Sequence, residues 1–290
     1  MIGRWLLRMI DAQVVWTRPL GSVTHRFLHW FFHRLPGLRD LLNGRWLGHP
    51  LHAVLTDAPI GILFLVIVFD LLAEGGAAAV ALVVGILAMV AAALAGTADY
   101  ADTDGTPRER ATLHATLMVV ALAGYLLSLL LRLGGDTTNV GATVTSIVSF
   151  LVLSAGAYVG GDVVYLTGNM VNRHAFRGAG AKWIALEPAE TDAGGDVPEG
   201  RPVKAKLGIN QLVLVRQGER VLALHDTCAH AGGPLSEGKL LDGTIECPWH
   251  ASRYRLENGH VVQGPSVYDQ PAYDVRRREG GGWEARRRPA

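Results

Sequence analysis

Four long apolar stretches constrain this chain of 290 residues more than any other feature. They cover residues 51–73, 75–98, 113–131 and 140–166, and each is close to the roughly 20 residues that cross about 30 Å of hydrocarbon. A buried helical core is the alternative, but stretches this long and nearly free of charge, separated by short polar loops, favour membrane spans. The sequence therefore predicts an α-helical bundle of four transmembrane helices over residues 48–170.

Residues 1–47 form a different kind of segment, in which Arg and His are mixed with Trp, Leu and Phe. Leu7, Ile10 and Val14 recur at helical spacing, which predicts an amphipathic helix lying in the membrane interface. A helix packed on protein would show the same pattern. Charged residues interrupt the first apolar run, so the segment does not fit a secretory signal peptide.

Basic residues near the spans lie mostly on one side of the predicted membrane. The opposite side offers only Arg132, beside Asp136. The positive-inside rule therefore predicts a multi-pass protein of the cell membrane with both termini and the C-terminal domain in the cytoplasm. The chain has two cysteines and so no spare pair for a structural disulfide, which suits a reducing compartment. The basic residues counted here are Arg4, Arg8, Arg18, Arg26, Arg34, Arg39, Arg45, Arg108, Arg110, Arg173, Arg177 and Lys182.

The pattern changes after the fourth span to short alternating runs separated by turns, such as residues 211–215 and 221–224. This pattern predicts an all-β domain of antiparallel sheets over residues 183–290. Residues 171–182 would form the linker. The fold class is thus two-part, a four-span helical bundle followed by a β domain.

Two Cys-His pairs lie in this domain, in Cys228-Ala229-His230 and in Cys247-Pro248-Trp249-His250. Two thiolates and two imidazoles could hold a tetrahedral zinc ion. Zinc sites more often space their cysteines and histidines differently, whereas here each cysteine has its own histidine on its own loop. That pairing suits a 2Fe-2S cluster in which one iron takes both thiolates and the other takes both imidazoles.

These residues resemble the Rieske family of ferredoxin type. Besides the two ligand boxes, the loop Gly232-Gly233-Pro234-Leu235 and the later Gly264-Pro265 match the family pattern, over nearly all of residues 183–283. The resemblance implies that Cys228 and Cys247 hold a buried iron. It also implies that His230 and His250 hold the outer iron near the surface, where exposed imidazoles pass electrons to a partner.

The resemblance also assigns roles to residues around the cluster. Ser252 and Tyr254 match hydroxyls that in high-potential members bond to a bridging sulfide and a cysteine sulfur, and such bonds stabilise the reduced cluster. As strand residues, both could also be purely structural. High-potential members carry a disulfide where this chain has Gly233 and Trp249, so packing and hydrogen bonds must hold the loops here.

The membrane part resembles an uncharacterised family of four-helix membrane proteins that are often fused to Rieske domains. The resemblance rests on residues 47–52, 57–61 and 160–162 and brings no established activity. Asp57, Asp70 and Asp162 are expected to face the bundle interior or the membrane boundary, because hydrocarbon disfavours charge.

Histidines flank the spans at His49, His52, His114 and His174, all on the predicted cytoplasmic side. His52 and His114, on facing helices, could bind haem b or line a quinone pocket, as helical bundles do elsewhere. Alternatively, they hydrogen-bond helix ends and anchor lipid headgroups.

Three functions follow: a membrane-anchored electron carrier, a quinone- or haem-linked oxidoreductase, and a redox-sensing membrane protein. The first is favoured, because no catalytic nucleophile with a base, carboxylate pair or nucleotide loop is recognisable. His225 and His260 are expected at the surface, which leaves no mononuclear iron motif in the β domain. The expected partners are the bilayer, a redox protein and, in the second reading, quinone. No basic face suggests nucleic acid.

Overall fold

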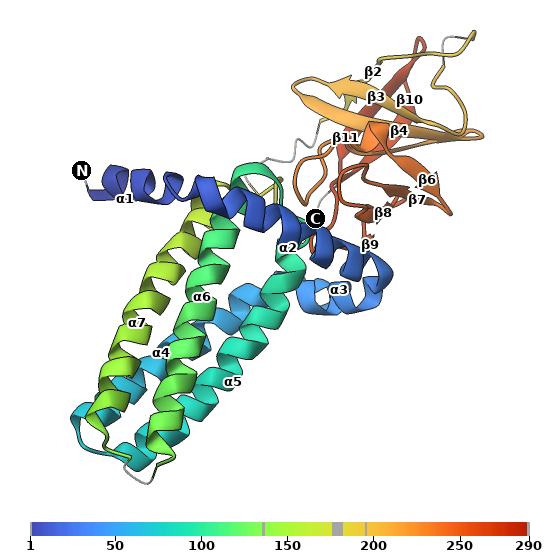
Figure 1. The fold of residues 1–290 in the computed structure, drawn as a ribbon. Helices are drawn as coiled ribbons and strands as arrows, with labels where there is room; N and C mark the ends of the chain where they lie inside the picture. Colours follow the sequence, from blue (N-terminus) through green and yellow to red (C-terminus); the bar gives the residue numbers. More distant parts are fainter. Residues whose placement is uncertain (1, 135–136, 176–181, 195, 289–290) are drawn as a thin grey trace. The chain divides into compact units, whose positions relative to one another are not determined.

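The computed structural model describes residues 2–134, 137–175, 182–194 and 196–288 (Figure 1). The chain divides into two compact units. One contains Met1–Leu38 and Pro50–Asn169, and the other contains Arg39–His49 and Met170–Ala290. Of the predicted linker at residues 171–182, residues 176–181 lie outside the described residues.

The helical elements come first in the chain. They are α1 (Ile2–Asp11), α2 (Val14–Arg34), α3 (Pro36–Asn43), a 3-10 turn η1 (Arg45–Leu47), α4 (Leu51–Leu71), α5 (Gly75–Tyr100), α6 (Gly105–Arg132), α7 (Val140–Gly161) and a π-helical turn η2 (Asp162–Leu166).

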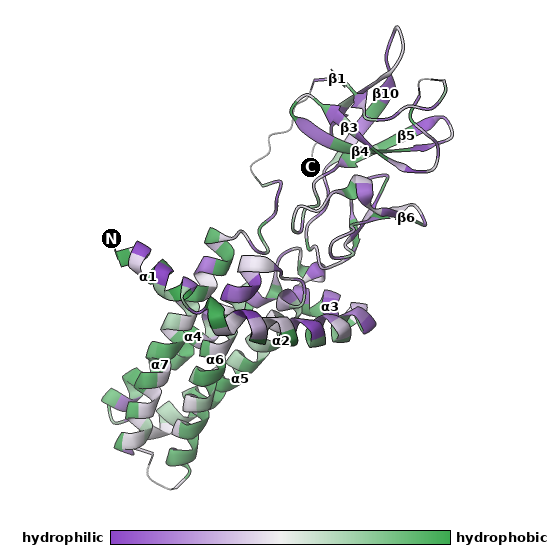
Figure 2. Cartoon of the chain, turned by 45° about the horizontal axis from the view of Figure 1, so that its top comes forward, coloured by the Kyte–Doolittle hydropathy of each residue, from purple (hydrophilic) through white to green (hydrophobic). Residues whose placement is uncertain are grey.

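Four of these helices are long and apolar enough to cross a membrane: α4, α5, α6 and α7 with its η2 extension. Figure 2 shows apolar residues along most of their length. Only 17% to 33% of each apolar window is buried inside the protein, which leaves the rest for lipid. The predicted spans are therefore confirmed. The third helix begins at Gly105, earlier than expected, because its polar first turns are also helical.

The spans pack as two helical hairpins, α4 against α5 and α6 against α7. Small residues allow close contact in the first hairpin, as is common between membrane helices. A Cβ atom on Gly85 would stand 2.5 Å from Cδ2 of Leu63, so any larger residue would force the Leu63 side chain to shift. Leu63, Val66 and Leu82 contribute to a core that Tyr125 and Leu153 complete from the other hairpin.

Charged residues in the spans are paired inside the helical unit. Both Arg132 Nη atoms bond the Asp70 carboxylate, at 2.8 and 2.7 Å, and both side chains are about 1% exposed. Arg110 likewise bonds Asp162 at 2.7 Å. Asp57, in contrast, is exposed. Sequence reasoning treated Arg132 as a flanking charge, which is wrong, since its guanidinium turns inward to Asp70.

The second unit contains two antiparallel sheets. The larger has the order β1-β11-β10-β5-β4-β3-β2 and the smaller the order β6-β7-β8-β9. The larger sheet comprises β1 (Ile184–Ala185), β2 (Glu187–Pro188), β3 (Pro202–Leu207), β4 (Asn210–Gln217), β5 (Arg220–His225), β10 (Ala272–Arg277) and β11 (Trp283–Arg287), and the smaller comprises β6 (Lys239–Leu241), β7 (Thr244–Glu246), β8 (Arg253–Arg255) and β9 (Val261–Gln263).

Two apolar clusters stabilise this unit, and the predicted all-β architecture is confirmed. One lies within the larger sheet, around Leu212, Leu214 and Trp283. The other joins the two sheets, with Val213 and Leu224 from the larger sheet against Ile245 and Tyr254 from the smaller one, and it includes both cysteines. The alternation in β4 explains this division, since neighbouring residues of a strand point to opposite faces.

The Asp70–Arg132 pair provides a first test. Asp70→Asn leaves a buried guanidinium without its counter-charge, which should cost about 3–5 kcal/mol of unfolding free energy. Glu190→Gln, at the exposed Arg201–Glu190 pair, is the control and should cost at most about 1 kcal/mol. Denaturant unfolding of the full chain in detergent measures both. Equal losses in the two variants would show that the buried pair does not stabilise the bundle.

Candidate metal centre

The four predicted ligands lie on two loops, one after β5 of the larger sheet and one after β7 of the smaller sheet. Hydrogen bonds across its base close the first loop: the Cys228 amide donates to the Gly233 carbonyl at 2.8 Å, and the Gly232 amide donates to the Cys228 carbonyl at 3.0 Å. Gly232 has a φ of 90°, a conformation that favours glycine. The backbone thus turns sharply just after the Cys228 box.

The second loop closes in the same way. The Cys247 amide donates to the Ser252 carbonyl at 2.8 Å, and the Ala251 amide donates to the Cys247 carbonyl at 3.1 Å. Ala251 has a φ of 61°, where a non-glycine residue costs about 1–2 kcal/mol. The loop is therefore held in a strained turn at Ala251.

Close approach of the two loops depends on Gly233. A Cβ atom there would stand 2.8 Å from Cys247 Sγ and 2.9 Å from Trp249 Cγ. Both cysteines are free of disulfides. Packing and hydrogen bonds hold the loops together in the described structure, as the sequence predicted for a chain without the disulfide.

The two thiols lie buried beside one another, at 1% and 3% exposure. The hydrogen bond from Cys228, together with hydrogen bonds from the backbone amides of Trp249 and His250, lowers the pKa of Cys247 to about 7. The same bond and burial raise the pKa of Cys228. The backbone amides at Cys247 thus favour the thiolate, the form that binds metal.

The two imidazoles face each other edge to face, with ring centroids 5.0 Å apart and an interplanar angle of 87°. Burial lowers the pKa of His230 to about 3, so its ring is neutral at physiological pH. Its Nδ1 atom is buried and has no hydrogen-bond partner. A buried ring nitrogen left without a partner is unfavourable unless it binds a ligand such as a metal ion.

The arrangement fits a binuclear centre better than a single ion. Among the described residues, no group of three or more His, Cys, Asp or Glu side chains could hold one metal ion, as tetrahedral zinc would require. Two thiols on one side and two imidazoles on the other suit two inequivalent irons with two protein ligands each.

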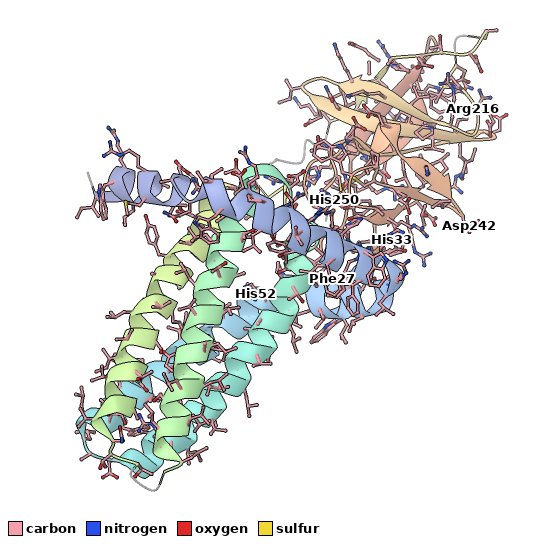
Figure 3. The ribbon with its side chains drawn as sticks, in the orientation of Figure 1. Phe27, His33, His52, Arg216, Asp242 and His250 are labelled. Atoms are coloured by element: carbon pink, nitrogen blue, oxygen red, sulfur yellow. The ribbon has the colours of Figure 1, made fainter. Side chains whose placement is uncertain are left out.

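The histidines differ in exposure. His230 is 5% exposed, whereas His250, which is labelled in Figure 3, is half-buried, and the adjacent Trp249 is 54% exposed. The expectation of two exposed imidazoles is therefore wrong for His230. The positive charges of Arg173 and Arg39 contribute to the lowered pKa of His230, after its burial and the neighbouring His250.

The segment before the first span braces the second cluster loop. Arg39 donates from Nη2 to the Gly264 carbonyl at 2.8 Å, and the Gly264 amide donates to Asp40 at 2.9 Å. A Cβ on Gly264 would stand 2.7 Å from the Asp40 oxygen. Two residues further on, the Ser266 amide donates to Ser252 Oγ at 3.0 Å. The Gly264-Pro265 motif thus connects residues 39–40 to the loop that carries Cys247.

The segment after the fourth span braces the first loop. His174 donates from Nε2 to the Thr227 carbonyl at 2.8 Å, and the Arg173 amide donates to the Ala229 carbonyl at 3.3 Å. The His174 ring also packs on His225, with centroids 4.5 Å apart. Sequence reasoning missed these contacts because they join residues more than 50 positions apart, and nothing local to His174 indicates them.

His225 and His260 differ from each other. His225 is 2% exposed, so its expected place at the surface is wrong. His260 is exposed, as expected, and bonds Asp269 at 2.7 Å.

The two predicted hydroxyl residues lie where they can act on the centre. Tyr254 is fully buried, with its hydroxyl 3.1 Å from Cys228 Sγ. Ser252 is also fully buried, and its Oγ accepts a bond from Ser266, which leaves its own hydrogen available to donate. A hydroxyl that donates to a thiolate sulfur stabilises added negative charge there.

Comparison with known proteins agrees with this geometry. The model of the Rieske [2Fe-2S] domain matches residues 188–274. The ferredoxin subunit of anthranilate 1,2-dioxygenase from Burkholderia cepacia is 31% identical over 78 residues, which are 27% of this chain and 72% of the relative. The chain belongs to the Rieske [2Fe-2S] family. Its Rieske domain implies a 2Fe-2S cluster, and the predicted resemblance is confirmed.

Other matches extend this result. The 3-phenylpropionate/cinnamic acid dioxygenase ferredoxin subunit of Escherichia coli (strain K12) is 34% identical over 81 residues, 28% of this chain and 76% of the relative. Apoptosis-inducing factor 3 of Mus musculus is 28% identical over 81 residues, 28% of this chain, but the chain spans only 13% of its length. Residues 48–173 match a predicted membrane protein family, DUF2231. The expected fusion of a membrane domain to a Rieske domain is thereby confirmed.

The Tyr254 contact gives a second test. Tyr254→Phe removes the hydroxyl beside Cys228, so the reduced cluster loses a hydrogen bond and the midpoint potential should fall measurably. Redox titration of the full-length protein monitors this change. Tyr273→Phe, at a buried tyrosine of the other apolar cluster, is the control and should leave the potential unchanged. The same potential in wild type and Tyr254→Phe would refute the role given to Tyr254.

Proposed function

We propose that this chain is a membrane-anchored one-electron carrier whose cluster is held by Cys228, His230, Cys247 and His250. The observation that carries the proposal is the convergence of two buried thiols and two facing imidazoles on loops that Gly233 allows to touch. A bound 2Fe-2S cluster supplies exchange of single electrons at a potential that its surroundings set.

Each residue of the site has a distinct part in this proposal. Cys228 and Cys247 hold the buried iron as thiolates, favoured at Cys247 by the backbone amides. The Nδ1 atoms of His230 and His250 hold the outer iron. Tyr254 donates a hydrogen bond to Cys228, and Ser252 donates to the sulfide side of the centre. The charges of Arg39 and Arg173, which act on His230, favour the reduced, more negative state.

Electrons would enter or leave through His250 rather than His230. His250 is the more exposed of the two, and Trp249 next to it offers an exposed aromatic surface of the kind common in protein interfaces. Two of the relatives are ferredoxin subunits of dioxygenases, and by analogy the partner here is a redox protein that docks at Trp249 and His250.

The membrane part would anchor the carrier, with both termini and the Rieske domain on the cytoplasmic side. The charge asymmetry supports this orientation. Arg132, the basic residue predicted on the opposite side, is neutralised by Asp70 and therefore does not weaken the predicted charge asymmetry. A reducing compartment also suits a site with two free thiols.

A quinone- or haem-linked membrane oxidoreductase is the alternative, favoured by the close approach of His52 and His114 in the helical unit. Steady-state reduction of quinone by the purified protein would support that activity. If added quinol does not change the reduction of the cluster, the quinone-linked alternative is excluded and the carrier proposal stands. A redox sensor would instead change the protease sensitivity of the loop around Arg108 when its cluster is reduced.

Substitution of the ligands tests the carrier directly. Cys228→Ser and His230→Gln should each abolish the reduced-state electron paramagnetic resonance signal of Rieske type, because each removes one of four ligands. His260→Gln is the matched control, since His260 is exposed and paired with Asp269. A Rieske-type signal that persists in Cys228→Ser would contradict the ligand set.

A further inference from the structure

The helical unit contains an internal repeat that centres on two histidines. Leu51-His52-Ala53 in α4 recurs as Leu113-His114-Ala115 in α6. The buried ion pair obeys the same repeat, since Asp70 and Arg132 each lie 18 residues after their histidine (70 − 52 and 132 − 114). The two hairpins therefore carry these polar groups at matching positions, and transporters built from repeats place their binding sites at the interface between the repeats.

Each histidine is held in the same way by the second helix of its hairpin. His52 Nδ1 lies 2.8 Å from the Ala92 carbonyl in α5, and His114 Nδ1 lies 2.8 Å from the Gly156 carbonyl in α7. A glycine four residues further along makes room for each ring. A Cβ atom on Gly96 would stand 3.0 Å from the His52 ring, and one on Gly160 would stand 3.0 Å from the His114 ring.

These bonds fix the tautomer of both rings. A carbonyl oxygen only accepts, so Nδ1 of each histidine must carry the hydrogen, and a neutral ring then keeps its lone pair on Nε2. Metal-binding histidines almost always donate their other ring N–H to a carbonyl or carboxylate in this manner. His52 and His114 are thus both prepared to bind a metal through Nε2.

The distance between the rings fits a shared metal. Their centroids are 6.2 Å apart and their planes are nearly perpendicular, at 80° (His52 is labelled in Figure 3). Two imidazoles on opposite sides of a metal ion, with metal–nitrogen bonds of about 2.0–2.1 Å and ring centres about 1.1 Å beyond each nitrogen, have centroids about 6.3 Å apart.

The geometry points to a second redox-metal site in this chain, in which Nε2 of His52 and Nε2 of His114 bind one transition-metal ion from opposite sides. Imidazole nitrogen suits iron and copper. The ion is either the iron of a haem, whose other four positions the tetrapyrrole fills, or a bare ion. Among the described residues no third His, Cys, Asp or Glu joins the pair, so the protein itself supplies two ligands. This site does not depend on the Rieske cluster.

The test uses the full-length protein in detergent with Cys228→Ser and Cys247→Ser, so that cluster iron does not contribute. The protein is loaded separately with haemin, with copper(II) and with iron(II), then desalted. Haem binding should give a Soret band with the sharp reduced-state bands of bis-imidazole coordination, and a bare ion should remain at about one equivalent per chain without such bands. Either result supports the site and identifies the source of the metal.

Substitutions then assign the ligands. His52→Gln and His114→Gln should each weaken binding at least about tenfold, whereas His49→Gln, an exposed histidine three residues before His52, should not. If a glutamine variant aggregates, His52→Gly with added imidazole serves instead, and imidazole should restore the spectrum. The inference is overturned if no metal is retained under any loading, or if the retained metal survives loss of both histidines.

Discussion

The contact between the two cluster loops is the constraint on which the Rieske unit depends. Each loop is closed by its own backbone hydrogen bonds, but nothing covalent joins the two. Gly233 allows the two loops to come so close that a Cβ atom at this position would clash with Cys247 Sγ. This close approach lets the four side chains share one centre. Residues 39–40 form hydrogen bonds with the backbone of Gly264, and residue 174 forms one with the backbone of Thr227, next to the first loop. The segments that adjoin the spans in sequence therefore serve as the support that a disulfide gives elsewhere.

The membrane unit contains two buried arginines, Arg132 and Arg110, that are each paired with a carboxylate. Asp70 and Arg132 are both almost fully buried and bond each other twice, and Arg110 bonds Asp162. In hydrocarbon an unpaired charge of this kind would be costly. His52 and His114 are also partnered, because the Nδ1 atom of each donates a hydrogen bond to a backbone carbonyl of a neighbouring helix. These two histidines occupy equivalent positions of the two hairpins, and their ring centroids lie 6.2 Å apart.

Much of this could be predicted from the sequence because the signals are local. Apolar length alone gives the four spans, and the spacing within Cys228–His230 and Cys247–His250 gives the ligand boxes. What escaped prediction depends on contacts between distant residues. The pKa of His230 is lowered by burial and also by the charges of Arg173 and Arg39, which lie 57 and 191 residues away in sequence (230 − 173 and 230 − 39). The inward turn of Arg132 needs Asp70 from another helix, and burial of His225 needs His174. The two residues of each pair lie too far apart in the sequence for a local pattern to include both.

The central claim is that two sulfurs and two ring nitrogens hold a pair of irons bridged by sulfide. Chemical analysis of the purified full-length protein for non-haem iron, acid-labile sulfide and zinc tests this most directly. The account predicts about two non-haem irons and about two sulfides per chain, with zinc near background. A preparation with about one zinc per chain and no labile sulfide would contradict it and would make the site a structural zinc centre.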